Sequence, residues 1–329
     1  MSPMKNVLVT GGTGFIGVEL VRELCNMGLR PRILVRRPHR AALLSSLEVD
    51  LVHGDLRSDE SLRRAVDGID TVFHLGARAS FESYRRLRPT IVDGTTALAR
   101  AAGAAGVEHF VFSSSLFVYG DQSDPIGAAT PTSPAIAYGR AKLEAEDALA
   151  TIAADAGMAV ASIRLPHVYG PQSILFDQVR SGFAIFPGGM RNQCGQLHVE
   201  DAARALAEVG RQRWTGRSAV ADDHIVDWLE FFEILRAFFP RLRLVTLPKS
   251  LGIAGATVIE PLLSRRTRPT LYTKDTVVGF NLNVPVEPGL VWSDLAAEPR
   301  YPTVREGIPA VLDGNVHFRW RHPLMDRRR

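Results

Sequence analysis

Thr10-Gly11-Gly12-Thr13-Gly14-Phe15-Ile16-Gly17 carries the clearest fold signal in this chain. It follows the apolar run Val7-Leu8-Val9 and leads into a helical pattern of apolar residues. A strand that turns through glycines into a helix N-terminus lets the backbone approach a pyrophosphate, whose charge the free amides and the helix dipole stabilise. The spacing Gly-x-x-Gly-x-x-Gly in this setting predicts a dinucleotide site. The predicted contacts are Gly11, Thr13, Gly14, Phe15, Ile16 and Gly17.

Apolar runs and helical patterns alternate through the first 165 residues. Nearly continuous apolar strands separated by helices indicate a parallel sheet covered on both faces, the doubly wound α/β class. Such sheets bind ligands at the carboxyl ends of their strands. The predicted strands span 5–10, 31–36, 49–53, 70–75, 107–113 and 159–165, and the predicted helices span 14–27, 58–67, 79–104 and 135–157.

The alternation breaks down after residue 170, because glycine and proline become frequent up to residue 195. A short strand near 196–199 and a helix through Asp201 and Val209 follow, and an apolar helix begins at Trp228. We predict two parts. Residues 1–170, with 196–225 returning to them, form a dinucleotide-binding domain, and 171–195 with 226–329 form a smaller substrate-binding lobe.

Composition limits the function classes. With 46% hydrophobic and 22% charged residues, the chain is typical of a soluble globular protein. The formal charge is +4 without a long basic block, which argues against a nucleic-acid partner. Cys25 and Cys194 lie far apart, so neither a disulfide nor a metal site is expected. The apolar stretch 251–263 is too short to span a bilayer, and no signal peptide is evident. We expect a cytoplasmic protein that acts on a small molecule.

Residues at the predicted strand ends indicate which dinucleotide is bound. Arg36 and Arg37 end the second strand, where an acidic residue would bind a ribose hydroxyl and an arginine suits a 2′-phosphate. They favour NADP over NAD, although NAD is also possible. The alternative interpretation is that Arg36 and Arg37 are solvated surface residues without a role in binding. Asp55 after the third strand could accept the adenine amino group. Further contacts are predicted at Leu56, Leu75, Gly76 and Ala77.

Three residues predict the chemistry. Tyr138 and Lys142 are four apart, so they share one face of a predicted helix. A tyrosine of ordinary pKa is a poor base at neutral pH, but a nearby ammonium and an oxidised nicotinamide would lower that pKa. Ser115, at the end of the fifth strand, could hold a substrate oxygen that changes between hydroxyl and carbonyl. The spacing Tyr-x-x-x-Lys alone is common by chance. It becomes a specific signal here because it follows a glycine phosphate loop and a serine-rich strand end, in that order.

These motifs, in this order, resemble those of the extended short-chain dehydrogenase/reductases, the superfamily of NAD-dependent epimerase/dehydratases. The motifs TGGTGFIG, GDL, HLGA, SSSLFVYG, YGRAK, RLPHVYGP and LHVEDAARA cover roughly the first two thirds of the chain. The resemblance implies a Rossmann fold, catalytic Ser115, Tyr138 and Lys142, and homodimers that pair helices 79–104 and 135–157. It also implies cofactor contacts at Ser113, Tyr138, Lys142, Pro166, His167 and Val168, and substrate contacts at Ser115, Leu116, Tyr138 and His167.

The chain departs from the family pattern in three places. Ile91 stands where an asparagine is usual, which puts an asparagine-bound relay water in doubt. His167 replaces the asparagine that often contacts a substrate diphosphate, and it could bind substrate or cofactor or simply pack. Leu116 and Phe117 occupy the places of the acidic pair that dehydratases use for acid and base work. Dehydration is therefore not expected.

The last third carries less specific signals. Residues 247–277 resemble the corresponding region of the 3-beta-hydroxysteroid dehydrogenase and dihydroflavonol reductase branches. Its apolar residues could line a pocket for an apolar substrate or simply pack the lobe: Leu251, Ile253, Val258, Ile259 and Leu262. We also expect His198 and Asp201 to organise the start of their helix, with Asp201 near a cap position.

The preferred hypothesis is an NADP-dependent ketone/alcohol oxidoreductase in which Tyr138 exchanges the proton. A nucleotide-sugar epimerase with tightly bound NAD is the alternative enzyme class, against which Arg36, Arg37 and His167 count. A non-catalytic, redox-sensing module on the same fold is the third reading, which the intact serine, tyrosine and lysine set disfavours. The substrate itself is not determined by these motifs.

Overall fold

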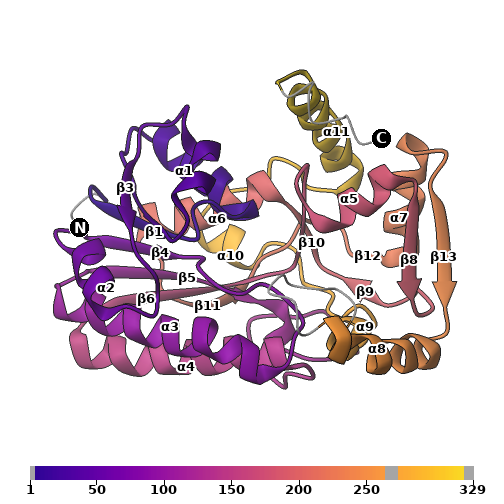
Figure 1. Ribbon diagram of the computed structural model, residues 1–329, viewed down its shortest axis with the longest axis horizontal. Helices are drawn as coiled ribbons and strands as arrows, with labels where there is room; N and C mark the ends of the chain where they lie inside the picture. The colour runs from indigo at the N-terminus through magenta and orange to yellow at the C-terminus, as the bar shows by residue number, and fades with distance from the viewer. Residues whose placement is uncertain (1–3, 264–272, 322–329) are drawn as a thin grey trace.

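The computed structural model describes residues 4–263 and 273–321 and contains a seven-stranded, fully parallel sheet (Figure 1). The strand order is β11-β6-β5-β4-β1-β2-β3, so the chain reverses direction across the sheet between β1 and β4. This is the predicted doubly wound α/β fold, which is confirmed. The strands are β1 (Val7–Thr10), β2 (Arg32–Val35), β3 (Asp50–His53), β4 (Thr71–His74), β5 (His109–Ser115), β6 (Ala159–Leu165) and β11 (Gly216–Ala219).

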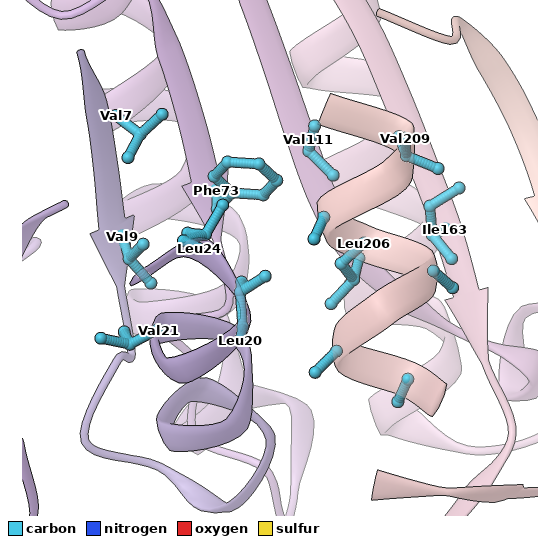
Figure 2. Close-up of a cluster of buried hydrophobic side chains, with 14 of the residues drawn as sticks. Val7, Val9, Leu20, Val21, Leu24, Phe73, Val111, Ile163, Leu206 and Val209 are labelled. Carbon is cyan, nitrogen blue, oxygen red and sulfur yellow. The ribbon is translucent and has the colours of Figure 1, made fainter. Parts of the chain in front are cut away.

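Helices cover both faces of this sheet because alternate strand side chains point to opposite faces. Val9 of β1 packs with α1 (Phe15–Asn26) and α6 (Val199–Gln212), which Figure 2 shows with Phe73, Val111 and Ile163. Leu8, one residue earlier, packs in the opposite cluster. This cluster on the opposite face is formed with α2 (Asp59–Val66), α3 (Tyr84–Ala104) and α4 (Ala137–Ala156).

Two predicted boundaries need correction at the carboxyl edge of the sheet. The helix predicted over 79–104 begins only at Tyr84, so 79–83 form the loop that follows β4. The fifth strand continues two residues beyond the prediction, to Ser115. Its last residues stay in register with β6, where Ser115 pairs with Leu165, and this backbone pairing outweighs the low strand propensity of serine. The serines are therefore held by a rigid strand.

A second apolar core lies beside the sheet and involves three small two-stranded sheets, β10–β7, β12–β9 and β13–β8. The parallel pair of β8 (Phe183–Pro187) and β13 (Arg243–Leu247) was not predicted, since 171–195 looked irregular in sequence. The remaining elements are η1 (Pro38–Leu44), η2 (Leu116–Val118), β7 (His167–Tyr169), α5 (Ile174–Ser181), β9 (Gln193–Cys194), β10 (Gln196–His198), β12 (Val226–Asp227), α7 (Trp228–Phe238), α8 (Lys249–Leu263), α9 (Lys274–Gly279), α10 (Leu290–Asp294) and α11 (Val304–Arg321).

The second core lies at the carboxyl ends of the main strands (Figure 1). The helix α6 and strand β11 follow residue 195 and yet join the layers of the main sheet. The division of the chain at 170, 195 and 225 stays a prediction. Within 4–263 and 273–321, no helix combines the length and the apolar character needed to cross a bilayer.

Candidate active site

The glycine loop after β1 is shaped by two close backbone approaches. Gly11 has φ +75°, and a Cβ there would lie 2.7 Å from the Gly76 amide nitrogen after β4. A Cβ on Gly17 would lie 2.1 Å from the Gly11 carbonyl oxygen, so only glycine lets α1 start this close to the strand. Gly14 is the N-cap of α1, and its amide donates to the Gly11 carbonyl at 2.8 Å. The loop is thus a cradle, and side chains at these glycine positions would fill its space.

The arginines predicted to select the dinucleotide lie at the neighbouring strand end. Arg36 and Arg37 follow β2 directly, are exposed, and form no ion pair with a residue in the described part of the chain. Asp55, predicted to meet adenine, is paired with Arg57, whose Nε lies 3.1 Å from its Oδ1. The hydrogen bonds from Arg57 lower the pKa of Asp55, and the charge of Arg36 acts in the same direction. Arg57 was missed in sequence, although it stands two residues after the predicted carboxylate.

A buried histidine ties the glycine loop to the next strand end. His74 Nδ1 lies 2.6 Å from the Thr10 hydroxyl, and its Nε2 lies 2.9 Å from the Thr95 hydroxyl. Thr95 donates to the Ile91 carbonyl and Thr10 accepts from the Gly76 amide, so Nε2 carries the proton and Nδ1 accepts. Burial lowers the pKa of His74 to about 3. The neutral ring therefore bridges β1, β4 and α3.

Replacing His74 by leucine should lower the free energy of unfolding by about 3 kcal/mol at pH 7, because two buried hydroxyls lose their partner. This loss should shrink by about 2 kcal/mol at pH 5. The unfolded histidine, with a pKa near 6.5, binds a proton there that the folded one refuses, so wild-type stability falls as pH drops below 6.5. Urea unfolding of both proteins at the two pH values measures this difference.

Other titrating groups cancel in that comparison because both proteins contain them. One is Asp222, a carboxyl whose pKa burial raises well above its usual range and which opposes the histidine effect. A stability difference that stays constant between pH 7 and pH 5 would contradict the neutral state assigned to His74.

The predicted catalytic residues lie on two adjoining elements. Ser115 ends β5, and Tyr138 and Lys142 share one face of the first turns of α4. The Lys142 Nζ donates to the Ser113 carbonyl at 2.5 Å and lies 5.9 Å from the centroid of the Tyr138 ring. A Cβ on Gly139 would lie 2.1 Å from the Phe117 carbonyl oxygen, so this glycine lets α4 press against the residues that follow Ser115.

The protonation states fit a proton donor better than a resting base. Burial raises the pKa of Tyr138 to about 12, contrary to the lowering expected from Lys142. The physical reason is that Lys142 is directed at the Ser113 carbonyl, while apolar rings surround the phenol. Burial lowers the pKa of Lys142 to about 8, and the charge of Glu146 opposes that shift. At neutral pH the phenol is protonated and the lysine is mostly charged.

A buried ion pair supports this helix from behind. The Glu146 carboxylate accepts from Arg164 at 3.1 Å (Nε) and 2.8 Å (Nη2), and it also accepts from the Ser114 hydroxyl. Arg164 donates to the Tyr119 hydroxyl at 2.9 Å. Sequence reasoning missed Glu146, although its spacing of four from Lys142 and eight from Tyr138 placed it on the catalytic face of the helix.

Aromatic rings continue from Tyr138 into the second core. Phe81 lies 5.8 Å from Tyr138 between ring centroids, and Phe280 lies 6.3 Å from Phe81. Phe280 in turn contacts Phe186 at 5.7 Å and Trp228 at 5.2 Å. These five rings, the aromatic row, come from five separate segments, so no local sequence pattern could reveal them. They connect the candidate catalytic tyrosine to the inner side of β8.

The comparisons with known proteins agree with this geometry. Residues 7–219 match the model of the family described as "NAD dependent epimerase/dehydratase family". The chain belongs to this family. It is an enzyme of the extended short-chain dehydrogenase/reductase superfamily, as the motifs implied.

Relatives within this superfamily differ in reaction. The chain is 29% identical over 325 residues to a ceramide reductase of Caulobacter vibrioides, covering 94% of this chain and 92% of the relative. It is 32% identical over 289 residues to a UDP-glucose 4-epimerase of Neisseria meningitidis, covering 71% and 82%. The solved structure titled MoeE5 in complex with UDP-glucose and NAD shares the fold at a TM-score of 0.78, with 24% identity and coverage of 95% and 99%.

The departures from the family pattern lie in apolar surroundings. Ile91 is fully buried in the core between the sheet and α3, so no polar side chain stands at this place of the family. Leu116 is buried in the second core, and Phe117 lies 6.4 Å from the Tyr138 ring. The acidic pair of dehydratases is thus replaced by side chains that pack.

His167 is held rather than free. Its Nδ1 lies 2.6 Å from the Gln196 Oε1, an acceptor, so Nδ1 carries the proton. Its ring lies 4.9 Å from that of Trp228, and burial lowers the pKa of His167 to about 4. Pro166 and Val168, its neighbours at the end of β6 and in β7, are half-buried. At neutral pH this position therefore offers no positive charge.

The expectations for the later helices hold in part. His198 is the N-cap of α6, as expected for the start of this helix, and the carboxylate of Asp201, in the first turn, accepts from the backbone amides of Arg300 and Tyr301. Leu251, Val258 and Ile259 of α8 are exposed, so they neither pack the lobe nor line an enclosed pocket. Ile253 is half-buried, whereas the side chain of Leu262 and all of 264–272 lie outside the described residues.

Neither cysteine is paired. Cys25 is half-buried and Cys194 is buried, and burial raises the pKa of both thiols. Across the described ranges, 4–263 and 273–321, no three His, Cys, Asp or Glu side chains are grouped to hold a metal ion.

Proposed function

We propose that this enzyme reduces the ketone of a long-chain, apolar substrate with NADPH. The observation that carries the proposal is the aromatic row, whose five rings lead from Tyr138 into the second apolar core and offer apolar contacts to a substrate. A neutral His167 at its edge supports the same conclusion, and so does the resemblance to a ceramide reductase along nearly the full chain.

The dinucleotide, when bound, supplies the hydride. We place its pyrophosphate at the glycine cradle, where Gly11, Gly14 and Gly17 leave room and α1 presents its amides. Arg36 and Arg37 would bind a 2′-phosphate, because both are exposed and free of ion pairs in the described chain. The remaining proposed contacts are Thr13, Phe15, Ile16, Asp55, Leu56, Leu75, Gly76, Ala77, Ser113, Pro166, His167 and Val168.

The side chains around the carbonyl then have separate roles. Ser115 donates a hydrogen bond to the substrate oxygen, and Tyr138 transfers its hydroxyl proton to that oxygen as the carbonyl becomes an alcohol. The charged Lys142 stabilises the phenolate left behind and binds the ribose of the dinucleotide. Leu116 and His167 contact the substrate beside the reacting carbon.

We further propose that the enzyme forms a homodimer through α3 and α4, which pack side by side on one face of the sheet. We propose a cytoplasmic location, where two free thiols such as Cys25 and Cys194 are usual.

A reductase assay tests the function. The purified enzyme should oxidise NADPH in the presence of a long-chain methyl ketone dispersed in detergent, and should do so faster than with NADH. Replacing Arg36 and Arg37 by serine should lower kcat/KM for NADPH by about tenfold or more, because two cations leave the 2′-phosphate. The same change should leave kcat/KM for NADH within about twofold.

The epimerase relative defines the opposing outcome. Recovery of tightly bound NAD from the denatured enzyme, together with epimerisation of UDP-glucose and no ketone reduction, would assign the enzyme to the epimerases.

Replacing Arg40 by serine is the matched control for the substitution of Arg36 and Arg37, because Arg40 is another exposed arginine a few residues further along the chain.

A further inference from the structure

Exposed apolar side chains gather on one part of the surface. Of the ten large hydrophobic residues that are exposed in the described chain, seven belong to β8, β13 and α8. They are Phe183, Ile185, Val245, Leu247, Leu251, Val258 and Ile259, and we call them the β8–β13–α8 surface. Large apolar groups clustered in this way mark an interaction site, whereas single ones are ordinary.

Strand pairing explains the first part of this surface. The parallel register sets Ile185 beside Val245 and Pro187 beside Leu247, so alternate residues of both strands share the outer face. Ala184 and Phe186 point to the other face and are buried. The two-stranded sheet is therefore apolar on both sides, although only its inner side has a core to pack against.

The helix α8 adds a second apolar element. Gly252 faces the protein, since a Cβ there would lie 2.9 Å from the Pro187 side chain, and Ala256 is buried. Leu251 and Val258 are seven residues apart and thus lie on one face, where they are 61% and 68% exposed. Figure 1 shows α8 at the lower right, next to the end of β13 and far from β1–β3.

The segment that carries five of these seven residues is basic. Between Arg241 and Ile259 the chain contains three cations and no carboxylate, and the next carboxylate, Glu260, accepts a hydrogen bond from the Lys274 amide. Arg241, Arg243 and Lys249 are exposed, and none of them forms an ion pair within the part of the chain that the structure describes. Apolar side chains bordered by unpaired cations match the apolar interior and anionic headgroups of a lipid bilayer.

The surface is also connected to the candidate active site. Phe186, on the inner face of β8, contacts Phe280 of the aromatic row, while Phe183 and Ile185 lie on the outer face of the same strand. Only one strand thus separates the rings that lead to Tyr138 from the exposed apolar side chains. An apolar substrate in a bilayer would lie close to this path.

We propose that the β8–β13–α8 surface docks onto an anionic membrane surface, from which the enzyme takes a lipid-like ketone. The docking is inferred from the exposed apolar residues and the cations beside them. Only the chemical nature of the substrate rests on the proposed function. The apolar side chains enter the boundary between the headgroups and the acyl chains of the leaflet that the enzyme faces, while Arg243 and Lys249 bind headgroup phosphates.

Vesicle flotation tests the docking. The wild-type enzyme should float with vesicles of phosphatidylcholine containing about one-third phosphatidylserine, and more weakly with phosphatidylcholine alone or at high salt. The double substitution Leu251→Glu with Val258→Glu should weaken binding to the anionic vesicles by about tenfold or more, because two exposed apolar side chains become charged. Substituting Arg243→Ser should weaken it less and remove part of the salt dependence.

A matched control adds the same charges elsewhere. Leu43→Glu with Leu51→Glu changes two side chains that are 46% and 53% exposed outside the β8–β13–α8 surface, and it should leave vesicle binding within about twofold. Wild-type enzyme that stays with the unbound fraction would overturn the proposal. So would a wild-type dimer that Leu251→Glu with Val258→Glu converts to monomers, because a second copy would then cover this surface.

The assay in detergent separates the two proposals. The Leu251→Glu, Val258→Glu enzyme should reduce a detergent-dispersed ketone at the wild-type rate, but the same ketone in anionic vesicles about tenfold or more slowly. Vesicle binding without any ketone reduction would leave the docking in place and contradict the proposed function. Ketone reduction without vesicle binding would do the reverse.

Discussion

Replacing Tyr138 by phenylalanine should lower kcat for ketone reduction by about a hundredfold to ten-thousandfold, the range that a general acid supplies. The ring remains, so the contacts with Phe81 and Phe117 persist, but no proton is available beside the substrate oxygen. Because burial keeps the phenol protonated at neutral pH, the loss should be present throughout the neutral range. Steady-state NADPH oxidation measures the change.

The affinity for the dinucleotide separates a chemical defect from a folding defect. NADPH binding, followed by fluorescence, should change by less than about threefold, because Tyr138 is replaced by a ring of nearly the same size. Tyr84→Phe is the matched control, since its hydroxyl donates to Glu144 at the surface, away from the catalytic face of α4. Retention of most of the turnover in Tyr138→Phe would show that another group donates the proton.

Replacing Glu146 by leucine should lower the free energy of unfolding by about 3–5 kcal/mol, the usual cost of breaking a buried ion pair from one side. The guanidinium of Arg164 would be left buried with only Tyr119 as a hydrogen-bond partner among the contacts described, and the Ser114 hydroxyl would lose its acceptor. Urea unfolding measures the loss. Adding Arg164→Met should recover part of it, since both charges are then absent.

Glu146 also supports the charge of Lys142, so the same variant has a catalytic signature. Removal of the carboxylate lowers the pKa of Lys142 further, and activity should then decline at a lower pH than in the wild type. Glu144→Leu, an exposed position two residues earlier on α4, should cost less than about 1 kcal/mol. A loss below that value for Glu146→Leu would show that the ion pair contributes little.

The parts of the site that could be predicted from the sequence are local in the chain. The glycine loop is a run of eight residues, and Tyr138 and Lys142 are related by one helical turn. The missed parts join distant segments. Phe81 and Phe280 are brought together by the fold, and Glu146 meets Arg164 across the interface of α4 and β6. Contacts of this kind leave no periodic signal.

Sequence patterns were enough to predict the doubly wound fold, the family and the set of motif residues, because hydrophobic periodicity and glycine spacing act within one strand, turn or helix. Which side chains meet and which stay in water became known from the folded chain alone. Leu251 and Val258 look like core residues in sequence, yet α8 turns Gly252 and Ala256 toward the protein and leaves these two exposed. Burial depends on what the other segments cover, and this is a property of the whole chain.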